Sequence, residues 1–232
     1  GMPGGGGGNM PGGSSNNLKS AKGIKFDGDI TISGGSIEVT ATGHEAIESK
    51  GILTMTGGTL YAYSTADDAV NSAGNMILSG GYVCGWSTGN DGIDANGDLK
   101  IQGACVYAVS TKGSPEVAVD ANTEGGHKLY VQSGSMVAVG GIESGSSITG
   151  SIYVCSGWSK SGWNALLDSS GNAVFAFKAP SSGSSMILYH NGKALSLNAG
   201  VSASGATIWG GNGCTSSISG GTAATVSTYN GR

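Results

Sequence analysis

Apolar and polar residues alternate in short segments through the first half of the chain. Ile30 and Ile32 flank a polar residue, and Ile37 and Val39 do so again after an intervening Gly-Gly pair. A period of two predicts β-strands that bury one face, and the glycines between them allow sharp turns. The pattern therefore predicts many short strands joined by glycine turns, without helices between them.

This alternating pattern repeats at a fixed interval along the chain. The Gly-Gly pair at 34–35 recurs at 57–58 and 80–81, and a degenerate Gly-Ala pair follows at 103–104. Among the apolar columns that repeat with the same step is the one that contains Ile24, Ile47, Val70 and Ile93. Three short strands in each repeat predict one coil of a parallel β-helix, whose coils lie about 4.8 Å apart. The predicted fold class is all-β, a parallel β-helix with about 23 residues per coil in the N-terminal half.

The repeat loosens in the second half of the chain. Val119 follows Ile93 by more than the regular step, so the fifth coil is longer. Residues 217–228 nevertheless resemble residues 31–42, and we therefore expect longer, irregular coils toward the C-terminus. The alternative is that residues 160–210 form a separate cap or strand layer.

These boundaries predict a single folded domain. Residues 1–18 are mostly glycine, proline and asparagine, which predicts a flexible leader. Residues 19–232 then form one β-helix domain, with regular coils over 19–115 and irregular coils or a cap over 116–232.

The composition excludes several classes of function. Glycine accounts for 45 of the 232 residues, only 11% of residues are charged, and the net charge is −4. Arg232 is the one arginine, and without a basic patch we expect no nucleic-acid partner. Without a run of about 18 apolar residues, we expect no transmembrane segment. The four cysteines lie far apart in the sequence, so we expect no zinc site.

Oxygen-bearing side chains recur in the same register as the apolar columns. One column contains Glu45, Asp68 and Asp91, and a second column begins three residues further along each coil. Carboxylates stacked about 5 Å apart repel one another unless a cation lies between them. Oxygen ligands alone favour a hard cation, and calcium takes six to eight of them. The alternative is a row of solvated turns, in which Asp and Asn are common.

We therefore expect Ca²⁺ between the coils. The second column contains Glu48, Asn71, Asp94 and, in the longer coil, Asp120. Asp67 stacks on His44 and Asn90 beside these columns, although no pattern of histidine or cysteine supports a transition metal. The complete set of candidate metal ligands is Glu45, Glu48, Asp67, Asp68, Asn71, Asn90, Asp91, Asp94 and Asp120.

The strand after each glycine pair turns alternate residues away from the core. The aromatic residues at these outward positions are Tyr61, Tyr63, Tyr82, Trp86 and Tyr107. A flat aromatic strip of this kind can stack on sugar rings, so these five residues are the candidate carbohydrate-binding residues. The alternative is that the C-terminal part of the chain covers this face and makes it a second core.

Two cysteines fall within the same outward strip. Cys105 lies in the coil after that of Cys84, two residues before the position directly beside Cys84. This offset places their α-carbons roughly 8 Å apart, beyond the limit of about 7 Å for a disulfide. We therefore expect free thiols here.

Several segments resemble a known family. The strings KGIKFDGDITISGGSIEVT, EAIESKGILTMTGGTLY, DDAVNSAGNMILSGG and NDGIDANGDLKIQG look like the carbohydrate-binding β-helix proteins of polysaccharide-using bacteria. The resemblance covers residues 19 to about 110 well and the remainder more weakly. It implies a polysaccharide-lyase-like, right-handed β-helix that binds calcium and plant cell-wall polysaccharides such as cellulose or pectin, without catalysis.

The resemblance also implies positions for the metal ligands. The acidic positions of the family carry over to Glu45, Glu48, Asp67, Asp68, Asn71, Asp91 and Asp94. Asn71 stands where a second carboxylate would be, which weakens one site. Lys22 and Lys25 occupy these columns in the first coil, so no ion is expected there.

The same fold includes polysaccharide-degrading enzymes, so fold alone does not decide the function. A pectate lyase needs a strong base near calcium, usually an arginine, and the only arginine here is the last residue. A polygalacturonase needs an acid and a base, which Asp67, Asp68 or Asp91 could supply. Their regular repetition argues for a structural or ion-binding role, because catalysis requires one asymmetric site. We therefore predict no catalytic residues.

The predicted function is a calcium-stabilised polysaccharide-binding or surface adhesion module, extracellular or at the cell surface. The alternatives are a degrading enzyme of the pectate lyase or polygalacturonase type and a purely structural spacer. The expected partner is a plant cell-wall polysaccharide or another acidic or neutral glycan. A monomer is the default state, although an open end of a β-helix can pair with another chain.

Overall fold

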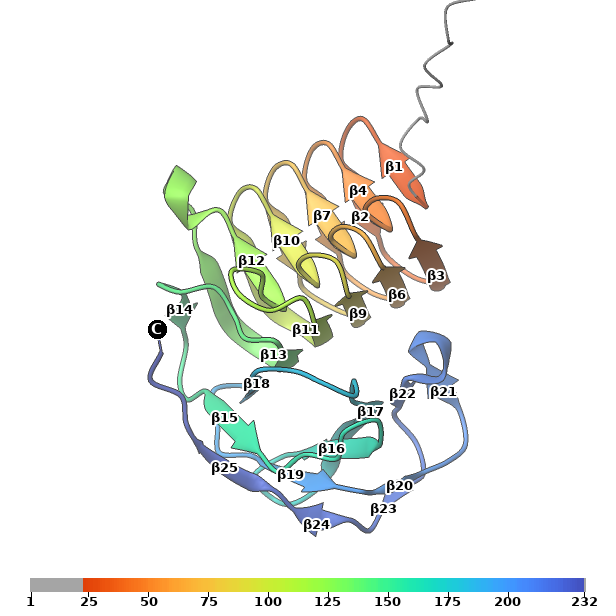
Figure 1. The fold of residues 1–232 in the computed structure, drawn as a ribbon, viewed down its shortest axis with the longest axis vertical. Coiled ribbons are helices and arrows are strands. Elements are labelled where there is room, and N and C mark those ends of the chain that lie inside the picture. Colours follow the sequence, from red (N-terminus) through yellow and green to blue (C-terminus); the bar gives the residue numbers. More distant parts are fainter. Residues whose placement is uncertain (1–22, 232) are drawn as a thin grey trace, which may run out of the picture.

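The computed structural model describes residues 23–231, and the predicted leader at 1–18 lies outside this range. The first part of the described chain is a solenoid of parallel strands in three rows (Figure 1). The first row contains β1 (Ile24–Phe26), β4 (Ile47–Ser49), β7 (Val70–Ser72), β10 (Ile93–Ala95) and β12 (Val119–Ala121). The second row contains β2 (Ile30–Ile32), β5 (Leu53–Met55), β8 (Met76–Leu78) and the first parts of β11 (Leu99–Ser110) and β13 (Leu129–Val139). The third row contains β3 (Ser36–Ala41), β6 (Thr59–Ser64), β9 (Tyr82–Ser87) and the remaining parts of β11 and β13.

The register of these strands confirms the predicted parallel β-helix. Ile24 lies beside Ile47, Val70 beside Ile93, and Ile93 beside Val119, which is the column expected from the repeat. The inward aliphatic residues form one continuous core, in which Leu53, Met76 and Leu99 are fully buried. The longer fifth coil is also present, since Val119 pairs with Ile93 and Leu129 with Leu99, each across more than the regular step.

The glycine pairs stack closely on one another. Gly58 has a φ of +82°, and a β-carbon on it would lie 2.7 Å from the carbonyl carbon of Gly34. Gly81 has a φ of +81° and stacks in turn on Gly58. Only glycine allows both this left-handed backbone and this close approach, which explains why the pair recurs in the first three coils.

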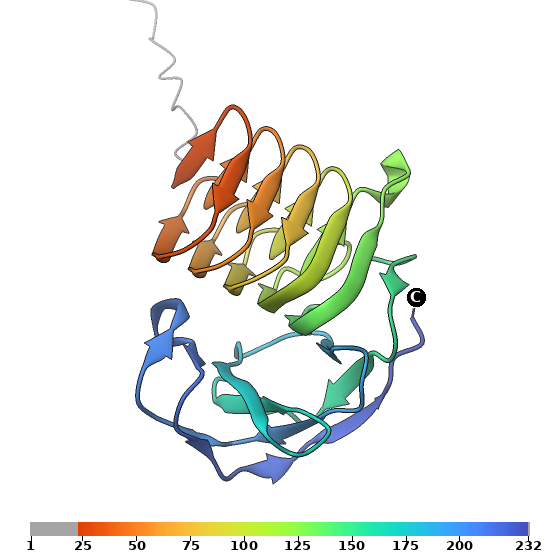
Figure 2. The same ribbon diagram turned by 180° about the vertical axis from the view of Figure 1, so that it is seen from behind.

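The chain beyond residue 150 departs from the solenoid. Its strands β15 (Tyr153–Ser156), β16 (Trp163–Leu167), β17 (Ala173–Lys178), β18 (Met186–His190) and β19 (Ser196–Ala199) pair antiparallel. They are accompanied by the short strands β20 (Ser202–Ala203), β21 (Thr207–Ile208), β22 (Gly213–Cys214), β23 (Ile218–Ser219), β24 (Thr222–Ala223) and β25 (Thr225–Thr228). Figures 1 and 2 show that these strands form a layer along one side of the solenoid. We call this the antiparallel layer.

The prediction that irregular coils continue to the C-terminus therefore holds only as far as β14 (Ser147–Ile148) and is wrong beyond residue 150. The alternative of a strand layer is right in kind, although the layer spans 153–228 and not only 160–210. Short turns such as the one at residues 168–171 reverse the chain, which gives antiparallel pairing in place of a crossover. Residues 217–228, which resemble the first coil in sequence, lie in strands that pair antiparallel with β20, β19 and β15.

The antiparallel layer covers the outward aromatic face of the solenoid. Tyr107 is fully buried, and its ring lies 4.9 Å from that of Phe177 and 5.8 Å from that of Trp209. Trp209 belongs to the single-turn 3-10 helix η2 (Trp209–Gly211). Burial of both apolar faces removes them from water, and this is the main stabilising term for such a contact.

The prediction of an open aromatic strip is therefore wrong for Tyr107. Tyr107 is part of a second core, and Tyr61, Tyr63, Tyr82 and Trp86 are half-buried. Tyr63 and Trp86 pack edge to face, with ring centroids 6.4 Å apart. The covering alternative describes this face correctly.

Other expectations concern the cysteines and the membrane. Cys84, Cys105, Cys155 and Cys214 are all free, as predicted for the first two. Two short elements, β14 (Ser147–Ile148) and the 3-10 helix η1 (Thr123–Gly125), complete the structure near the last coil. Within residues 23–231, no helix has the length and apolar character needed to cross a membrane.

Candidate functional site

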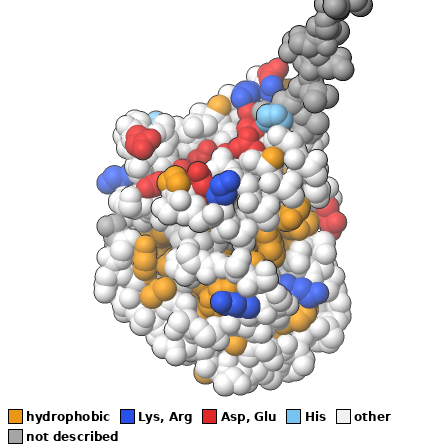
Figure 3. Space-filling model, in the orientation of Figure 1, with side chains coloured by type: hydrophobic (Ala, Val, Ile, Leu, Met, Phe, Trp, Pro, Cys, Tyr) orange, Lys and Arg blue, Asp and Glu red, His pale blue; other side chains and the backbone are white. Residues whose placement is uncertain are grey.

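The acidic side chains form a band on the face of the first strand row. Glu48, Asn71, Asp94 and Asp120 lie side by side in parallel register, which confirms this column as a physical ladder. Figure 3 shows Asp and Glu side chains as a band across the stacked coils. The register therefore places the predicted ligands close together, although it does not by itself show that an ion is bound.

Three carboxylates of the last coils converge most closely. Asp91, Asp94 and Asp120 each offer one oxygen atom, and these atoms lie within 4.8 Å of one another. Asn71 connects this group to the preceding coil, because its Nδ2 donates to Asp94 Oδ2 at 2.9 Å and to Asp68 Oδ2 at 3.1 Å. We call Asp68, Asn71, Asp91, Asp94 and Asp120 the acidic cluster.

Backbone amides orient two members of the acidic cluster. The amide of Val117 donates to Asp91 Oδ1 at 2.6 Å, and the amide of Asp91 donates to Asp68 Oδ1 at 3.1 Å. In each carboxylate one oxygen accepts from the backbone. The side chains are thus held in place by the coil itself.

Burial and mutual repulsion raise the pKa values of the acidic cluster. Burial, and then the charges of Asp94 and Asp91, raise the pKa of Asp68 to about 9. Burial raises the pKa of Asp91 to about 7. Burial also raises the pKa of Asp94 to about 6, although hydrogen bonds, including one with Asn71, oppose this shift. Carboxylates in this environment favour either a shared proton or a cation.

Glu143, a carboxylate outside the predicted set, interacts with Asp120 of the acidic cluster. Burial and a hydrogen bond with Glu143 raise the pKa of Asp120 to about 9. Burial also acts to raise the pKa of Glu143, but hydrogen bonds from Asp120 and Ser144 outweigh it and lower that pKa. The interaction between the two carboxyl groups thus raises the pKa of Asp120 and lowers that of Glu143.

The acidic cluster opens into a cavity of about 430 Å³. The carboxylates that line it are Asp91, Asp94, Glu116, Asp120, Glu124 and Glu143. Sequence reasoning missed Glu116, Glu124 and Glu143. For Glu143 a signal exists, because it follows Asp120 by the same step that separates Asn71 from Asp94. The longer step between the fourth and fifth coils obscured this signal, because Asp120 does not follow Asp94 by the regular step.

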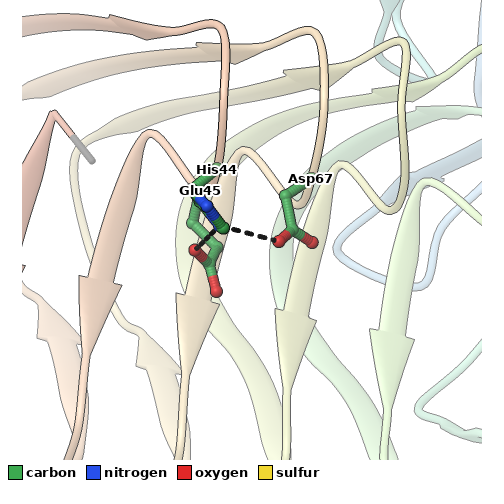
Figure 4. A group of neighbouring side chains, drawn as sticks. All are labelled: His44, Glu45 and Asp67. Carbon is green, nitrogen blue, oxygen red and sulfur yellow. Dashed lines mark ion pairs between the residues drawn. The ribbon is translucent and has the colours of Figure 1, made fainter. Parts of the chain in front are cut away.

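A second group, formed by His44, Glu45 and Asp67, lies among the first coils. His44 Nδ1 lies 4.0 Å from Glu45 Oε2 and 3.9 Å from Asp67 Oδ2 (Figure 4). Asp67 Oδ1 points away from the histidine and accepts from Asn90 Nδ2 and from the amide of Asp68, both at 3.0 Å. Asp67 therefore has partners in both neighbouring coils. His44 lies near two carboxylates, those of Glu45 and Asp67.

A buried serine column positions this second group. The hydroxyls of Ser64, Ser87 and Ser110 each donate to the backbone carbonyl of the residue 20 positions away, which is His44, Asp67 and Asn90 respectively. These bonds are 2.6–2.7 Å long. The turns that present these three residues are thus fixed to the preceding strand row.

Glu48 lies beside Asn71 in the ladder, at the edge of the acidic cluster. It is 2% exposed, and it forms an ion pair with Lys50. Lys25 lies beside it in register at the end of the ladder. Lys25 and Lys50 thus lie near Glu48 at this end of the acidic ladder, whereas Lys22 lies outside the described residues.

A comparison with protein families shows to which family the chain belongs. A family model described as a carbohydrate-binding domain-containing protein matches residues 4–69 and residues 19–157. The chain belongs to this carbohydrate-binding family. The longer match spans the described solenoid, with both groups of acidic residues, and ends before most of the antiparallel layer. No match was found among curated proteins or among solved structures.

Membership of the carbohydrate-binding family supports a glycan as the partner at a coarse level. It also agrees with the family resemblance of the sequence segments in the first four coils. Of the five predicted aromatics, Tyr107 is buried under the antiparallel layer and cannot contact a glycan while that layer covers it. The other four are half-buried.

Proposed function

We propose that this protein is a calcium-stabilised, non-catalytic polysaccharide-binding module that acts outside the cell or at its surface. The observation that carries the proposal is the carboxylate-lined cavity at the acidic cluster, in a chain of the carbohydrate-binding family. Buried carboxylates with raised pKa values need a positive partner when they ionise. A divalent cation supplies it.

The donor set fits calcium. Every candidate ligand in the acidic cluster offers oxygen, and calcium binds six to eight oxygens at about 2.3–2.6 Å. Two ligands on opposite sides of such an ion lie roughly 4.6–5.2 Å apart. The oxygens of Asp91, Asp94 and Asp120 lie within 4.8 Å of one another, so small side-chain shifts suffice. In this proposal Glu143 is a further ligand.

The same ion provides a way to hold a glycan. Three or four protein carboxylates leave coordination positions for water or for sugar oxygens. The cavity is polar, so a hydroxyl-rich or carboxylate-bearing sugar suits it better than an apolar ligand. Tyr63 and Trp86, which are half-buried, offer aromatic edges on a different row of the solenoid.

The absence of catalysis is supported by the arrangement of the acidic groups. Asp68, Asp91 and Asp94 belong to columns that repeat along the solenoid and bond mainly to one another and to the backbone. An acid and base pair for glycoside hydrolysis needs two carboxylates on opposite sides of the sugar bond. Repeated columns on one ridge favour ion binding over that geometry.

A sedimentation assay with insoluble polysaccharides tests the proposal. The full chain is mixed with cellulose or with calcium-precipitated polygalacturonate, and bound protein is measured with calcium or with chelator. We expect binding that falls at least tenfold in the Asp94→Asn, Asp120→Asn double variant. Asp168→Asn, in an exposed turn remote from the cavity, is the matched control. Release of reducing or unsaturated sugars would overturn the non-catalytic assignment.

One observation favours a second candidate, a structural spacer. The aromatic face that could have bound sugars is largely covered by the antiparallel layer. A spacer would still bind calcium but would retain no polysaccharide. Calcium binding by calorimetry, together with no retention on any glycan tested, would support this candidate over the proposed function.

A further inference from the structure

A hairpin at the edge of the antiparallel layer reaches back to the solenoid. β21 and β22 pair antiparallel through two residue pairs, and β22 is held to β17 by two more. In the part of the chain that the structure describes, β21 pairs with β22 alone and ends its sheet. Figure 2 shows this blue hairpin directed toward the first coils, and η2 lies at its tip. We call residues 207–214 the lid.

Trp209 is the buried residue at the tip of the lid. Its side chain is 1% exposed, whereas Thr207 and Gly210, on either side of it, are exposed. The indole contacts both parts of the molecule, with ring centroids 5.8 Å from Tyr107 of the solenoid and 5.5 Å from Phe175 of β17. The indole is therefore a plug that a mostly exposed hairpin inserts between the solenoid and the layer.

The closed lid has two unfavourable features. Trp209 has a φ of +58°, a left-handed conformation that a bulky side chain rarely adopts. Its indole N–H is buried and has no hydrogen-bond acceptor within residues 23–231. The strained backbone and the buried donor favour an open lid, whereas burial of the indole favours a closed one. Such a balance is expected of a segment that changes position on binding a ligand.

The lid contacts one outward column of the solenoid. The residues of this column, side by side in parallel register, are Glu38, Tyr61, Cys84 and Tyr107. Trp86 packs edge to face against Tyr107, with ring centroids 6.0 Å apart. The lid therefore closes over a place where three aromatic side chains of the solenoid lie close together.

Two polar groups of this column hold the lid. The amide of Gly210 donates to Glu38 Oε1 at 3.1 Å, and Asn212 Nδ2 donates to the hydroxyl of Tyr61 at 3.3 Å. When the lid leaves, this carboxylate and this hydroxyl are free to bind sugar hydroxyls. The rings of Tyr61 and Tyr107 then offer apolar faces with a polar tip, as a sugar ring requires.

We propose that the lid opens to admit a neutral sugar chain, one ring of which takes the place of the Trp209 indole against Tyr61 and Tyr107. The carboxylate of Glu38 would repel an acidic sugar, so a neutral one is favoured. This site lies on the third strand row, whereas the acidic cluster lies on the first. It rests on the proposed function only for the class of partner, a glycan.

Gly213 offers a way to open the lid. A β-carbon on Gly213 would overlap Cε3 of Trp209, and Gly213 does not have a left-handed φ. Gly213→Ala therefore displaces the indole without removing it. Gly34→Ala is the matched control, because an added β-carbon there meets nothing within 4 Å and its φ is also not left-handed.

Thiol labelling measures the opening. Cys84 is fully buried in the column that the lid contacts, and Cys155 is buried in the same second core but belongs to β15. The full chain is treated with iodoacetamide at one pH, and each cysteine is followed by peptide mass spectrometry. We expect Gly213→Ala to label Cys84 at least tenfold faster than the wild type and Gly34→Ala do, with Cys155 unchanged. An equal rise at both cysteines would overturn the proposal, because the whole layer would then loosen.

Calorimetric titration with cellohexaose in chelator tests the sugar site without calcium. We expect Gly213→Ala to bind at least tenfold more tightly than the wild type, since the indole no longer competes. Trp209→Ala removes the indole without an overlap and should show the same gain, so it replaces Gly213→Ala if thermal melts show that variant unfolded. Hexagalacturonate, an acidic chain of equal length, should bind more weakly than cellohexaose.

Two results would overturn the sugar site. One is the absence of a gain in cellohexaose affinity in folded variants, and the other is tighter binding of hexagalacturonate than of cellohexaose. Both are measured without calcium, so neither depends on the calcium-dependent retention that tests the proposed function.

Discussion

The phenolic hydroxyl of Tyr107 donates a hydrogen bond of 2.6 Å to the backbone carbonyl of Lys178. Tyr107 belongs to β11 of the solenoid and Lys178 ends β17 of the antiparallel layer. The ring of Tyr107 is fully buried between the two parts. This contact therefore joins two units whose backbone pairing differs in direction, and it fixes how the layer lies on the solenoid.

Removal of the hydroxyl should weaken this connection. Tyr107→Phe leaves the Lys178 carbonyl without this donor in a partly buried place, so we expect the free energy of unfolding to fall by about 1–2 kcal/mol. Tyr107→Ala also creates a cavity and should cost roughly 3–5 kcal/mol. Urea denaturation followed by tryptophan fluorescence measures both values. Tyr130→Phe, at a half-buried solenoid position, is the control and should change stability by less than about 0.5 kcal/mol.

The stacking of the glycine pairs gives a second prediction with an internal control. Gly35 and Gly58 have nearly the same φ, +77° and +82°, but a β-carbon on Gly35 meets nothing within 4 Å. Gly35→Ala should cost about 1 kcal/mol from the backbone conformation alone. Gly58→Ala should cost several kcal/mol more, because its β-carbon would meet the backbone of the preceding coil. Equal losses in the two variants would contradict the stacking argument.

The repeat made the solenoid and its ladders predictable. A constant period assigns each of Ile47, Asn71 and Asp94 to a column, and parallel pairing turns a column into a set of neighbours. The antiparallel layer was not predictable in this way, because its hairpins depend on individual turns and do not repeat. An outward face looks the same in sequence whether solvent or another layer covers it, which is why the sequence left open whether Tyr107 is buried.

The candidate site shows the same limit. The column that contains Asp94 and Asp120 was predicted from the period, but the cavity also takes Glu116 from the loop of the longer coil. Loop residues have no column, so the sequence alone does not bring them to the site. The packing of His44 against Asp67 was readable from the register, whereas the orientation of each oxygen required the hydrogen bonds.

Calcium should stabilise the folded chain if the acidic cluster binds it. At a calcium concentration one hundred times the Kd, binding adds about 2.7 kcal/mol to the free energy of unfolding. For a chain of this length that corresponds to a rise in Tm of roughly 5–10 °C. Thermal melts with calcium and with chelator measure the shift. Asp94→Asn with Asp120→Asn should abolish it, whereas Asp168→Asn should retain it, and an unchanged Tm in the wild type would contradict calcium binding.

Without calcium, stability should depend on pH in a direction unusual for carboxylates. Burial raises the pKa of Asp68 and of Asp120 to about 9, from a value of 3.8 for an unperturbed aspartate. Between about pH 4 and pH 9 the folded chain therefore holds protons that the unfolded chain has released. The stabilisation is fully present below the unfolded pKa and is lost as the pH rises through the folded pKa. We expect the free energy of unfolding in chelator to fall from pH 5 to pH 9.

Two comparisons separate this effect from a general pH dependence. The variant Asp68→Asn with Asp120→Asn removes the two most perturbed carboxyl groups, so its stability should change less over the same range. Saturating calcium should reverse the trend in the wild type, because metal ligands must be deprotonated and affinity therefore rises with pH. Urea denaturation at pH 5, 7 and 9, with chelator or with calcium, provides both measurements. Stability in chelator that rises from pH 5 to pH 9 would show that these carboxylates ionise readily in the folded chain.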